Sequence, residues 1–327
     1  MRKVLLVLGA LSAVVPAGAQ QAGFSGPVEG LTFDPPTGSI RQVIGSLGSS
    51  RLGPPLISLL DFASVAPGQS YAIAVRAGQP FLVAGLGSGS ASLTALPGAN
   101  PKPEGVAWSG DGSAAVLYSL SGGWIQMFTG LPAALNSAAA VSVAPLGGTL
   151  TAVATDSSGQ TAVVGIAGTN AGVYSFDGSN FSLLLPVSQP AALAISGGTL
   201  FVLDASTNEV SQISLSSSAS QSWVLGADNT IALWPAVNAA GRNVLYVVTG
   251  SNPVLEVYDS ASMQMIGSVP LSFDPTGITP LGTSSFVLRP RSVAGDPLWA
   301  FADRGQPAVY FVPAPVEEFR RRGVPER

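Results

Sequence analysis

The sequence predicts an all-β fold: a β-propeller of six full four-stranded blades plus a partial N-terminal unit. The first observation is a unit of about 43 residues that is visible six times along the chain. The second is that each unit holds short apolar runs bounded by Gly, Ser or Asn, which is typical of buried strands. The third is the 39 Gly and 26 Pro residues, which interrupt nearly every window of about ten residues and argue against helix.

Each unit begins with a short apolar strand, makes a tight turn of small residues and continues into a strongly β-branched strand. The six turns are Pro67–Gly68, Asp111–Gly112, Ser158–Gly159, Gly197–Gly198, Ala240–Gly241 and Gly282–Thr283. Four short strands per period of about 40–50 residues indicate a propeller blade, because a small sheet with two apolar faces needs a neighbour on each side. An outer-membrane barrel is the alternative β architecture, but its strands need about 9–11 residues and these run about five to seven.

The N-terminus adds half a unit. Residues 30–45 read as two strands joined at Pro36–Gly38, and we expect these to be the third and fourth strands of an incomplete blade. Little strand-like sequence follows Pro313 to supply the missing partners. The sequence therefore leaves open whether a seventh blade is completed or the half unit packs on the outside.

The first 19 residues have the three regions of a secretory signal peptide. A positive start is followed by 12 apolar residues, Val4 to Val15, and then by Ala17 and Ala19 in the small-x-small pattern of a cleavage site. No later run reaches about 18 apolar residues, so no membrane span is expected. We predict an extracytoplasmic protein, secreted or periplasmic, with a signal peptide at 1–19, the propeller at 20–314 and a polar tail at 315–327.

The composition excludes several kinds of chemistry. The chain has no cysteine and no histidine, which removes disulfides, thiolate metal sites and the commonest general base at neutral pH. Two of its 14 basic residues, Arg2 and Lys3, fall in the signal peptide, so the mature chain is more acidic than the net charge of −4. The body of the chain carries no basic cluster, and we expect no nucleic-acid partner.

Three segments resemble known propeller repeats. Residues 243–271 resemble the YVTN-type unit, with a strand, an Asn-containing loop and a second strand ending in Asp259. Residues 189–215 resemble the related NHL-type unit, and residues 103–118 resemble the start of the same class. The resemblance covers most of residues 57–314 and implies the architecture of a secreted bacterial propeller. Such relatives include binding proteins and lactone-hydrolysing enzymes, so the fold by itself does not give the activity.

The acidic residues fall into two sets. Asp at a hairpin turn bonds its own backbone, so we interpret one set as structural. That set is Asp34, Asp111, Asp156, Asp177, Asp259 and Asp303. The opposite face carries the loops between second and third strands and the links between blades, where propellers commonly bind ligands. The ligand-binding candidates there are Arg76, Glu104, Asp204, Asp228, Asp274, Arg289 and Arg291.

Arginine in this second set suits an anionic or carboxylate group, which a guanidinium can bind in bidentate fashion. Carboxylates such as Glu104 and Asp204 are ligands that Ca²⁺ accepts, but their spacing does not match a calcium loop, and we predict no metal, cofactor or catalytic residue. The tryptophans end or lie within predicted strands, and we expect their indoles inside the blades.

The predicted function is a binding or interaction module that uses loops at the channel mouth, with an unknown protein or small-molecule ligand. One alternative is a hydrolase of a lactone or ester that uses a metal held by carboxylates, and it rests on the resemblance alone. A second alternative is a structural surface protein without a small-molecule site.

Overall fold

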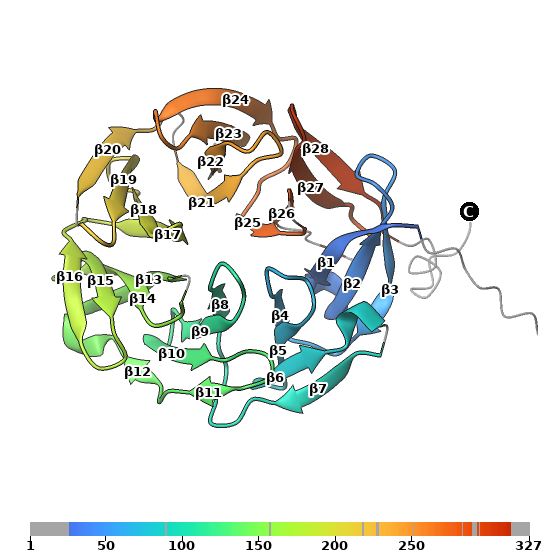
Figure 1. Cartoon of the computed structure of the whole chain (residues 1–327), viewed down its shortest axis with the longest axis horizontal. Coiled ribbons are helices and arrows are strands. Elements are labelled where there is room, and N and C mark those ends of the chain that lie inside the picture. The colour runs from blue at the N-terminus through green and yellow to red at the C-terminus, as the bar shows by residue number, and fades with distance from the viewer. Residues whose placement is uncertain are drawn as a thin grey trace, which may run out of the picture.

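The chain forms a closed ring of seven small antiparallel sheets around a central axis, as a computed structural model shows (Figure 1). The structure describes residues 26–314, except 89, 157, 218, 227–228, 251, 283, 290–292 and 294. The predicted signal peptide and the polar tail lie outside these residues. We number the sheets as blades 1 to 7 in chain order.

Blade 1 is the N-terminal unit and has three strands, β1 (Val28–Asp34), β2 (Ser39–Ile44) and β3 (Arg51–Ile57). A short 3₁₀ turn, η1 (Pro35–Thr37), joins the first two. The sequence-based assignment of this half unit was wrong in one respect. Its two strands are the first and second of the blade, not the third and fourth, and β1 contacts the central cavity.

Blades 2 and 3 follow the predicted units. Blade 2 consists of β4 (Phe62–Val65), β5 (Ala72–Arg76), β6 (Gln79–Ala84) and β7 (Ser92–Ala95), with the 3₁₀ turn η2 (Leu86–Ser88) before β7. Blade 3 consists of β8 (Gly105–Trp108), β9 (Ala114–Ser119), β10 (Trp124–Thr129), β11 (Asn136–Ser137) and β12 (Val141–Ser142), followed by the turn η3 (Ala144–Leu146). Its fourth strand is split into β11 and β12, which both pair with β10. This split explains why the sequence pattern is weakest there.

Blades 4 and 5 are regular four-stranded sheets. Blade 4 consists of β13 (Gly148–Thr155), β14 (Ala162–Gly168), β15 (Gly172–Phe176) and β16 (Phe181–Leu185). Blade 5 consists of β17 (Pro190–Ser196), β18 (Thr199–Asp204), β19 (Glu209–Ser214) and β20 (Ser220–Val224). In both, the strands pair in sequence order from the axis outwards.

Blades 6 and 7 complete the ring. Blade 6 consists of β21 (Thr230–Val237), β22 (Asn243–Thr249), β23 (Val254–Asp259) and β24 (Gln264–Pro270). Blade 7 consists of β25 (Gly277–Pro280), β26 (Ser285–Arg289), β27 (Leu298–Asp303) and β28 (Pro307–Val312). The all-β propeller prediction is confirmed, and the partial unit serves as the seventh blade. No helix among the described residues has the length and apolar character needed to cross a membrane.

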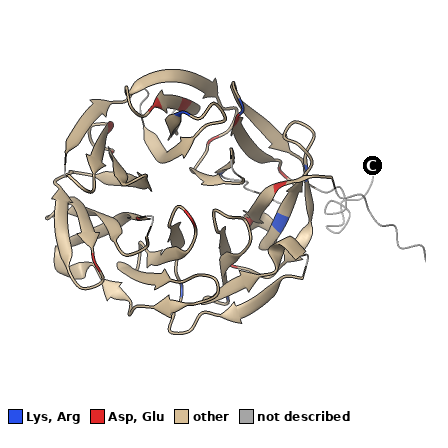
Figure 2. Ribbon diagram, viewed as in Figure 1, with Lys and Arg blue, Asp and Glu red and all other residues tan. Residues whose placement is uncertain are grey.

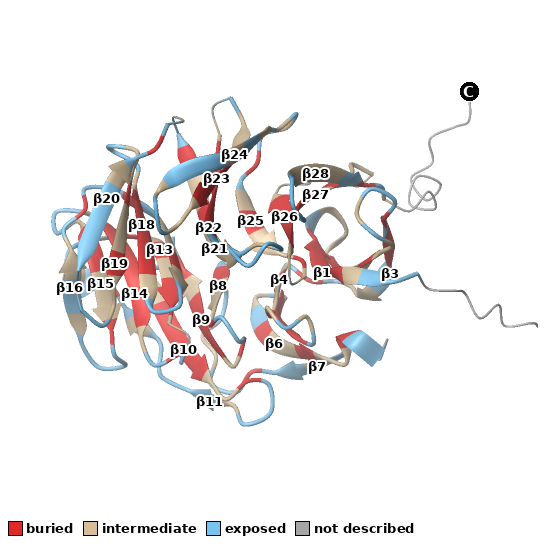
Figure 3. Ribbon diagram, turned by 45° about the horizontal axis from the view of Figure 1, so that its top comes forward, coloured by how far each residue is buried: buried red, intermediate tan, exposed pale blue. Residues whose placement is uncertain are grey.

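Burial is greatest in the middle strands of each blade, because both of their faces pack against neighbouring blades (Figure 3). Strand β22 is an example: all its residues after Asn243 are buried. Between blades 6 and 7, Tyr246 packs edge-on against Phe286 and Phe301, with ring centroids 5.1 and 4.9 Å apart. A middle strand therefore reads as a continuous apolar run, whereas the outermost strands keep exposed side chains.

The ring closes where blade 7 meets blade 1. Gly30 makes this closure possible, since a Cβ there would lie 1.5 Å from the carbonyl oxygen of Leu281. The N–H of Leu52 donates to the oxygen of Pro313 at 3.1 Å, and Arg304 pairs with Glu29. Closure therefore depends on packing and a few polar contacts between the two chain ends, and each end contributes its own sheet.

Candidate functional site

A cavity of about 690 Å³ runs along the axis of the ring. Residues of all seven innermost strands line it, which are β1, β4, β8, β13, β17, β21 and β25. Figure 2 shows that charged residues are few and are distributed around the ring. Among the described residues that line the cavity, Arg289 alone carries a charge.

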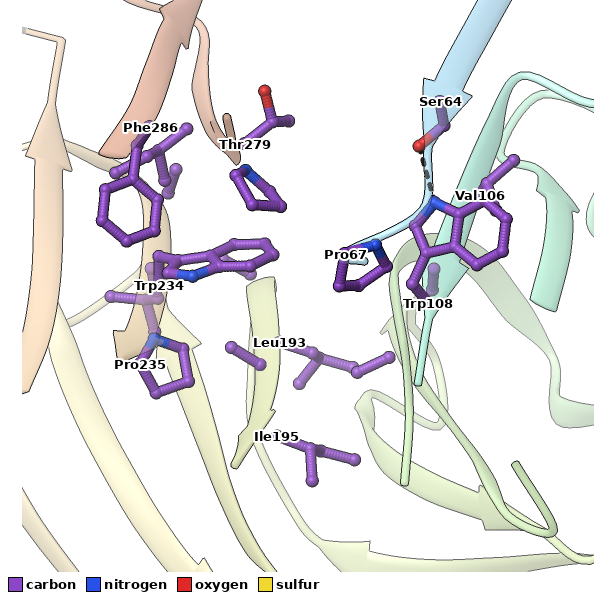
Figure 4. Close-up of a pocket in the computed structure, with 18 of the residues that line it drawn as sticks. Ser64, Pro67, Val106, Trp108, Leu193, Ile195, Trp234, Pro235, Thr279 and Phe286 are labelled. Carbon is purple, nitrogen blue, oxygen red and sulfur yellow. Dashed lines mark hydrogen bonds between the residues drawn. The ribbon is translucent and has the colours of Figure 1, made fainter. Parts of the chain in front are cut away.

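Much of the cavity wall is apolar. Leu193 and Ile195 of β17 point into it, and the ring of Trp234 faces Pro67 across the open space (Figure 4). Trp108 also lines the cavity and donates its indole N–H to the hydroxyl of Ser64, 2.9 Å away in the neighbouring blade. An apolar lining with a few placed polar groups is typical of small-molecule sites.

The two cavity tryptophans differ in part from the sequence prediction. Each packs edge-on against a ring of an adjacent blade, Trp108 on Tyr71 and Trp234 on Phe286, as expected for indoles between sheets. Both also line the cavity, because they lie on innermost strands. The sequence pattern places them at strand ends, but the ring decides that those strands surround a lumen.

Tyr118 and Arg289 supply polar groups at one end of the cavity, where the second strands of their blades end. They lie on the second strands of blades 3 and 7, which face one another across the channel (Figure 1). Each is paired in register with a glycine that starts the innermost strand, Tyr118 with Gly105 and Arg289 with Gly277. The phenol lies directly over Gly105, where a Cβ would be 2.2 Å from the ring carbon Cζ. Glycine at this position therefore lets a second-strand side chain reach the lumen.

These two side chains influence one another electrostatically. Burial lowers the pKa of Arg289 from its ordinary value, while the Tyr118 phenol acts to raise that pKa. Burial raises the pKa of Tyr118; the Arg289 charge lowers it, and the Glu104 carboxylate raises it. Neither the guanidinium nor the phenol makes a hydrogen bond or ion pair with any part of the chain that the structure describes. Both groups therefore keep donors available to the cavity.

Three other predicted site residues, Arg76, Glu104 and Asp204, bond to loops at the edge of their own blades. The Arg76 guanidinium donates to the carbonyls of Leu59 and Ser58, at 3.1 and 2.5 Å. The Glu104 carboxylate accepts from the hydroxyl and the backbone N–H of Ser121, which lowers the pKa of Glu104. None of the three lines the cavity.

The third of these residues is Asp204, which accepts from the backbone N–H groups of Ser188, Gln189 and Ser206. Partial burial acts to raise its pKa, but these bonds and one from the Ser206 hydroxyl outweigh it and lower the pKa. Each of the three residues thus connects the link between blades to the loop between second and third strands.

The remaining candidates do not join Arg289 within the described structure. Asp274 is exposed on the link into β25 and does not line the cavity. Asp228 and Arg291 lie outside the described residues. A ligand-binding role for the seven residues stays a prediction, and Arg289 is the member that the structure places at the cavity.

The turn carboxylates behave as predicted, with two additions. Asp177 and Asp259 accept backbone N–H groups of their own turns, and these bonds are the largest cause that lowers the pKa of each. Asp34 and Asp303 are buried and do more. Asp34 pairs with Arg41, while Asp303 accepts from the Tyr246 hydroxyl of blade 6 at 3.2 Å.

No group of three or more His, Asp or Glu side chains suited to a metal occurs among the described residues. The metal-dependent hydrolase stays an untested alternative. Tyr118 was missed by sequence reasoning. The available signal was a glycine at the start of an innermost strand that pairs with a large polar residue at the end of the next strand, as Gly105 pairs with Tyr118.

Comparisons with known proteins support the architecture. The fold resembles the solved structures of U3-55K and of the RRP9 WD40 repeats, each with a TM-score of 0.56 and 10% sequence identity. In both cases the match covers 77% of this chain and 80% of the other. No family model and no curated protein matches the sequence. At this identity the likeness shows a propeller with WD40-repeat neighbours and gives no family.

Proposed function

We propose that this protein is an extracytoplasmic binding module of the secreted YVTN/NHL type, which takes a small-molecule ligand into its central channel. The signal-peptide pattern supports the location, and the repeat resemblance supports the type. The propeller ring, with WD40 repeats among its solved neighbours, supports a binding role by analogy of fold alone. The observation that carries the proposal is the axial cavity, which has an apolar wall and the side chain of Arg289, a guanidinium without a partner in the described part of the chain.

A channel-blocking variant tests this role. Ala191 lines the cavity and is exposed, so Ala191→Trp places a bulky indole ring in the lumen and narrows it without entering the core between blades. Ala139, exposed on the loop between β11 and β12 at the outside of the ring, provides the matched control Ala139→Trp. Ligand-observed NMR with a mixed panel of anionic, neutral and cationic fragments compares the two variants.

We expect fragments that bind the wild-type protein and Ala139→Trp but lose binding in Ala191→Trp. If every bound fragment treats the two variants alike, or if none binds, the channel is not the ligand site. Fractionation of cells that express the full chain tests the location: the mature protein should leave the cytoplasm with residues 1–19 removed. A product that stays in the cytoplasm at full length would contradict export.

A further inference from the structure

The cavity has one polar end and one apolar wall, and the polar end holds an uncompensated positive charge. A charge held away from water is costly unless it is paired. The Arg289 side chain is half-buried, burial lowers its pKa, and its guanidinium makes no hydrogen bond or ion pair with the described residues. The charge therefore favours an anion at this end of the channel. A guanidinium binds a carboxylate through two parallel N–H bonds, and the Tyr118 hydroxyl adds a third donor from the opposite blade.

The chain as a whole does not attract anions, since its net charge is −4. Attraction must come from the Arg289 side chain itself and act at short range. A small inorganic anion would use that end of the cavity and leave most of the 690 Å³ unfilled. The rest of the wall, including Leu193, Ile195 and Trp234, offers apolar surface to the remainder of the ligand (Figure 4).

We propose that the channel binds an amphipathic organic carboxylate, with its head group between Arg289 and Tyr118 and its apolar body along Leu193, Ile195 and Trp234. This inference rests on the proposed function and names the ligand class of the same site. The Tyr118 phenol is suited to donate, because burial raises its pKa and keeps it protonated at neutral pH. Burial of the apolar body supplies the affinity, and the charge supplies the selectivity.

Three probes with the same ten-carbon chain test the charge requirement: decanoate, decanol and the decyltrimethylammonium ion. Binding is followed by calorimetry and by tryptophan fluorescence, to which Trp234 in the wall should respond. We expect decanoate to bind about 10- to 100-fold more tightly than decanol, the range for losing charge-assisted hydrogen bonds. The cation should bind more weakly than decanol. Equal affinity for all three probes would overturn the inference.

Two matched variants locate the effect. Arg289→Met should lower decanoate affinity about 10- to 100-fold and leave decanol within about threefold. Arg76→Met is the control, because Arg76 ends the second strand of blade 2 as Arg289 ends that of blade 7, but its guanidinium bonds loop carbonyls away from the cavity. Decanoate affinity that survives Arg289→Met, or falls equally in Arg76→Met, would refute the head-group site.

Different results would refute the binding-module proposal and the carboxylate inference. If fragments bind in the channel but decanoate shows no advantage over decanol, the binding module stands and the carboxylate inference is wrong. If Ala191→Trp changes no binding at all, both are wrong. The wild-type comparison of the three probes needs no mutation, so a variant that misfolds does not decide the result. A charge reversal, Arg289→Glu, should shift the preference towards decyltrimethylammonium.

Discussion

Blades 1 and 7 are neighbours in the ring, and each carries an arginine whose surroundings differ in kind. In blade 1, Arg41 is 3% exposed and has polar partners. Its guanidinium lies 3.1 Å from the Asp34 carboxylate and donates to the Gly53 carbonyl at 3.0 Å. In blade 7, Arg289 lines the channel without an ion pair or hydrogen bond to the described chain. A buried ion pair cannot lose one partner without destabilising the fold, whereas a charge without partners is available to a ligand.

The largest effect should come from Arg41. Arg41→Met leaves the Asp34 carboxylate buried without its cation, and the free energy of unfolding should fall by about 3–5 kcal/mol. Urea denaturation followed by circular dichroism measures it. The double variant Arg41→Met, Asp34→Leu removes both charges and should recover much of the loss. A single variant as stable as the wild type would remove the contrast between the two arginines.

Replacing Arg76 should have an intermediate effect on the free energy of unfolding. Arg76→Met should lower the free energy of unfolding by about 1–2 kcal/mol, because two charge-assisted bonds to Ser58 and Leu59 are lost at a partly exposed site. The same urea titration checks the value. A loss as large as that of Arg41→Met would mean that the link between blades 1 and 2 depends on this side chain more than its exposure suggests.

Replacing Arg289 should have the opposite effect and stabilise the protein. In the ligand-free protein, Arg289→Met should raise the free energy of unfolding by about 1 kcal/mol, because an apolar side chain replaces a desolvated charge that has no partner among the residues the structure describes. Urea denaturation without added ligand is the measurement. A clear loss of stability would show that the guanidinium has a structural partner, and its assignment to a ligand would fail.

The proximity of Arg289 to Tyr118 can be measured through the phenol. The positive charge acts to lower the pKa of Tyr118, so Arg289→Met should move that pKa upwards. Titration of tyrosinate absorbance near 295 nm follows it, with Tyr118→Phe identifying the signal. An unchanged pKa would place the two side chains too far apart to share one head group.

The smallest effect is expected at the surface. Glu29 pairs with Arg304 where the ring closes, but the Arg304 side chain is 50% exposed. Glu29→Gln should change the free energy of unfolding by about 0–1 kcal/mol, as for other exposed ion pairs. Thermal unfolding in low and high salt checks it. A larger loss would indicate that this ion pair contributes more to the stability of the closed ring than its exposure suggests.

The sequence predicted the repeat, the strands of blades 2–7 and the turn carboxylates well, because each depends on local patterns. Val244 to Thr249, for example, reads as a buried strand from its residue types alone. Blade 1 was misassigned, since two strands and a turn look the same whether they are the inner or the outer pair of a sheet. Tyr118 was missed for a similar reason, because its access to the lumen depends on Gly105 in a different strand.

By itself the sequence determined an all-β repeat with six full units, rich in turns and poor in charge, because strand and turn signals are contained within a few residues. Only the tertiary structure decided that the N-terminal half unit closes the ring and that one arginine faces an axial cavity. Register between strands and packing between blades set these features. Arg76 and Arg289 end equivalent strands in two similar units. Their surroundings differ, so Arg76 bonds loop carbonyls whereas Arg289 lines the cavity as a candidate ligand site.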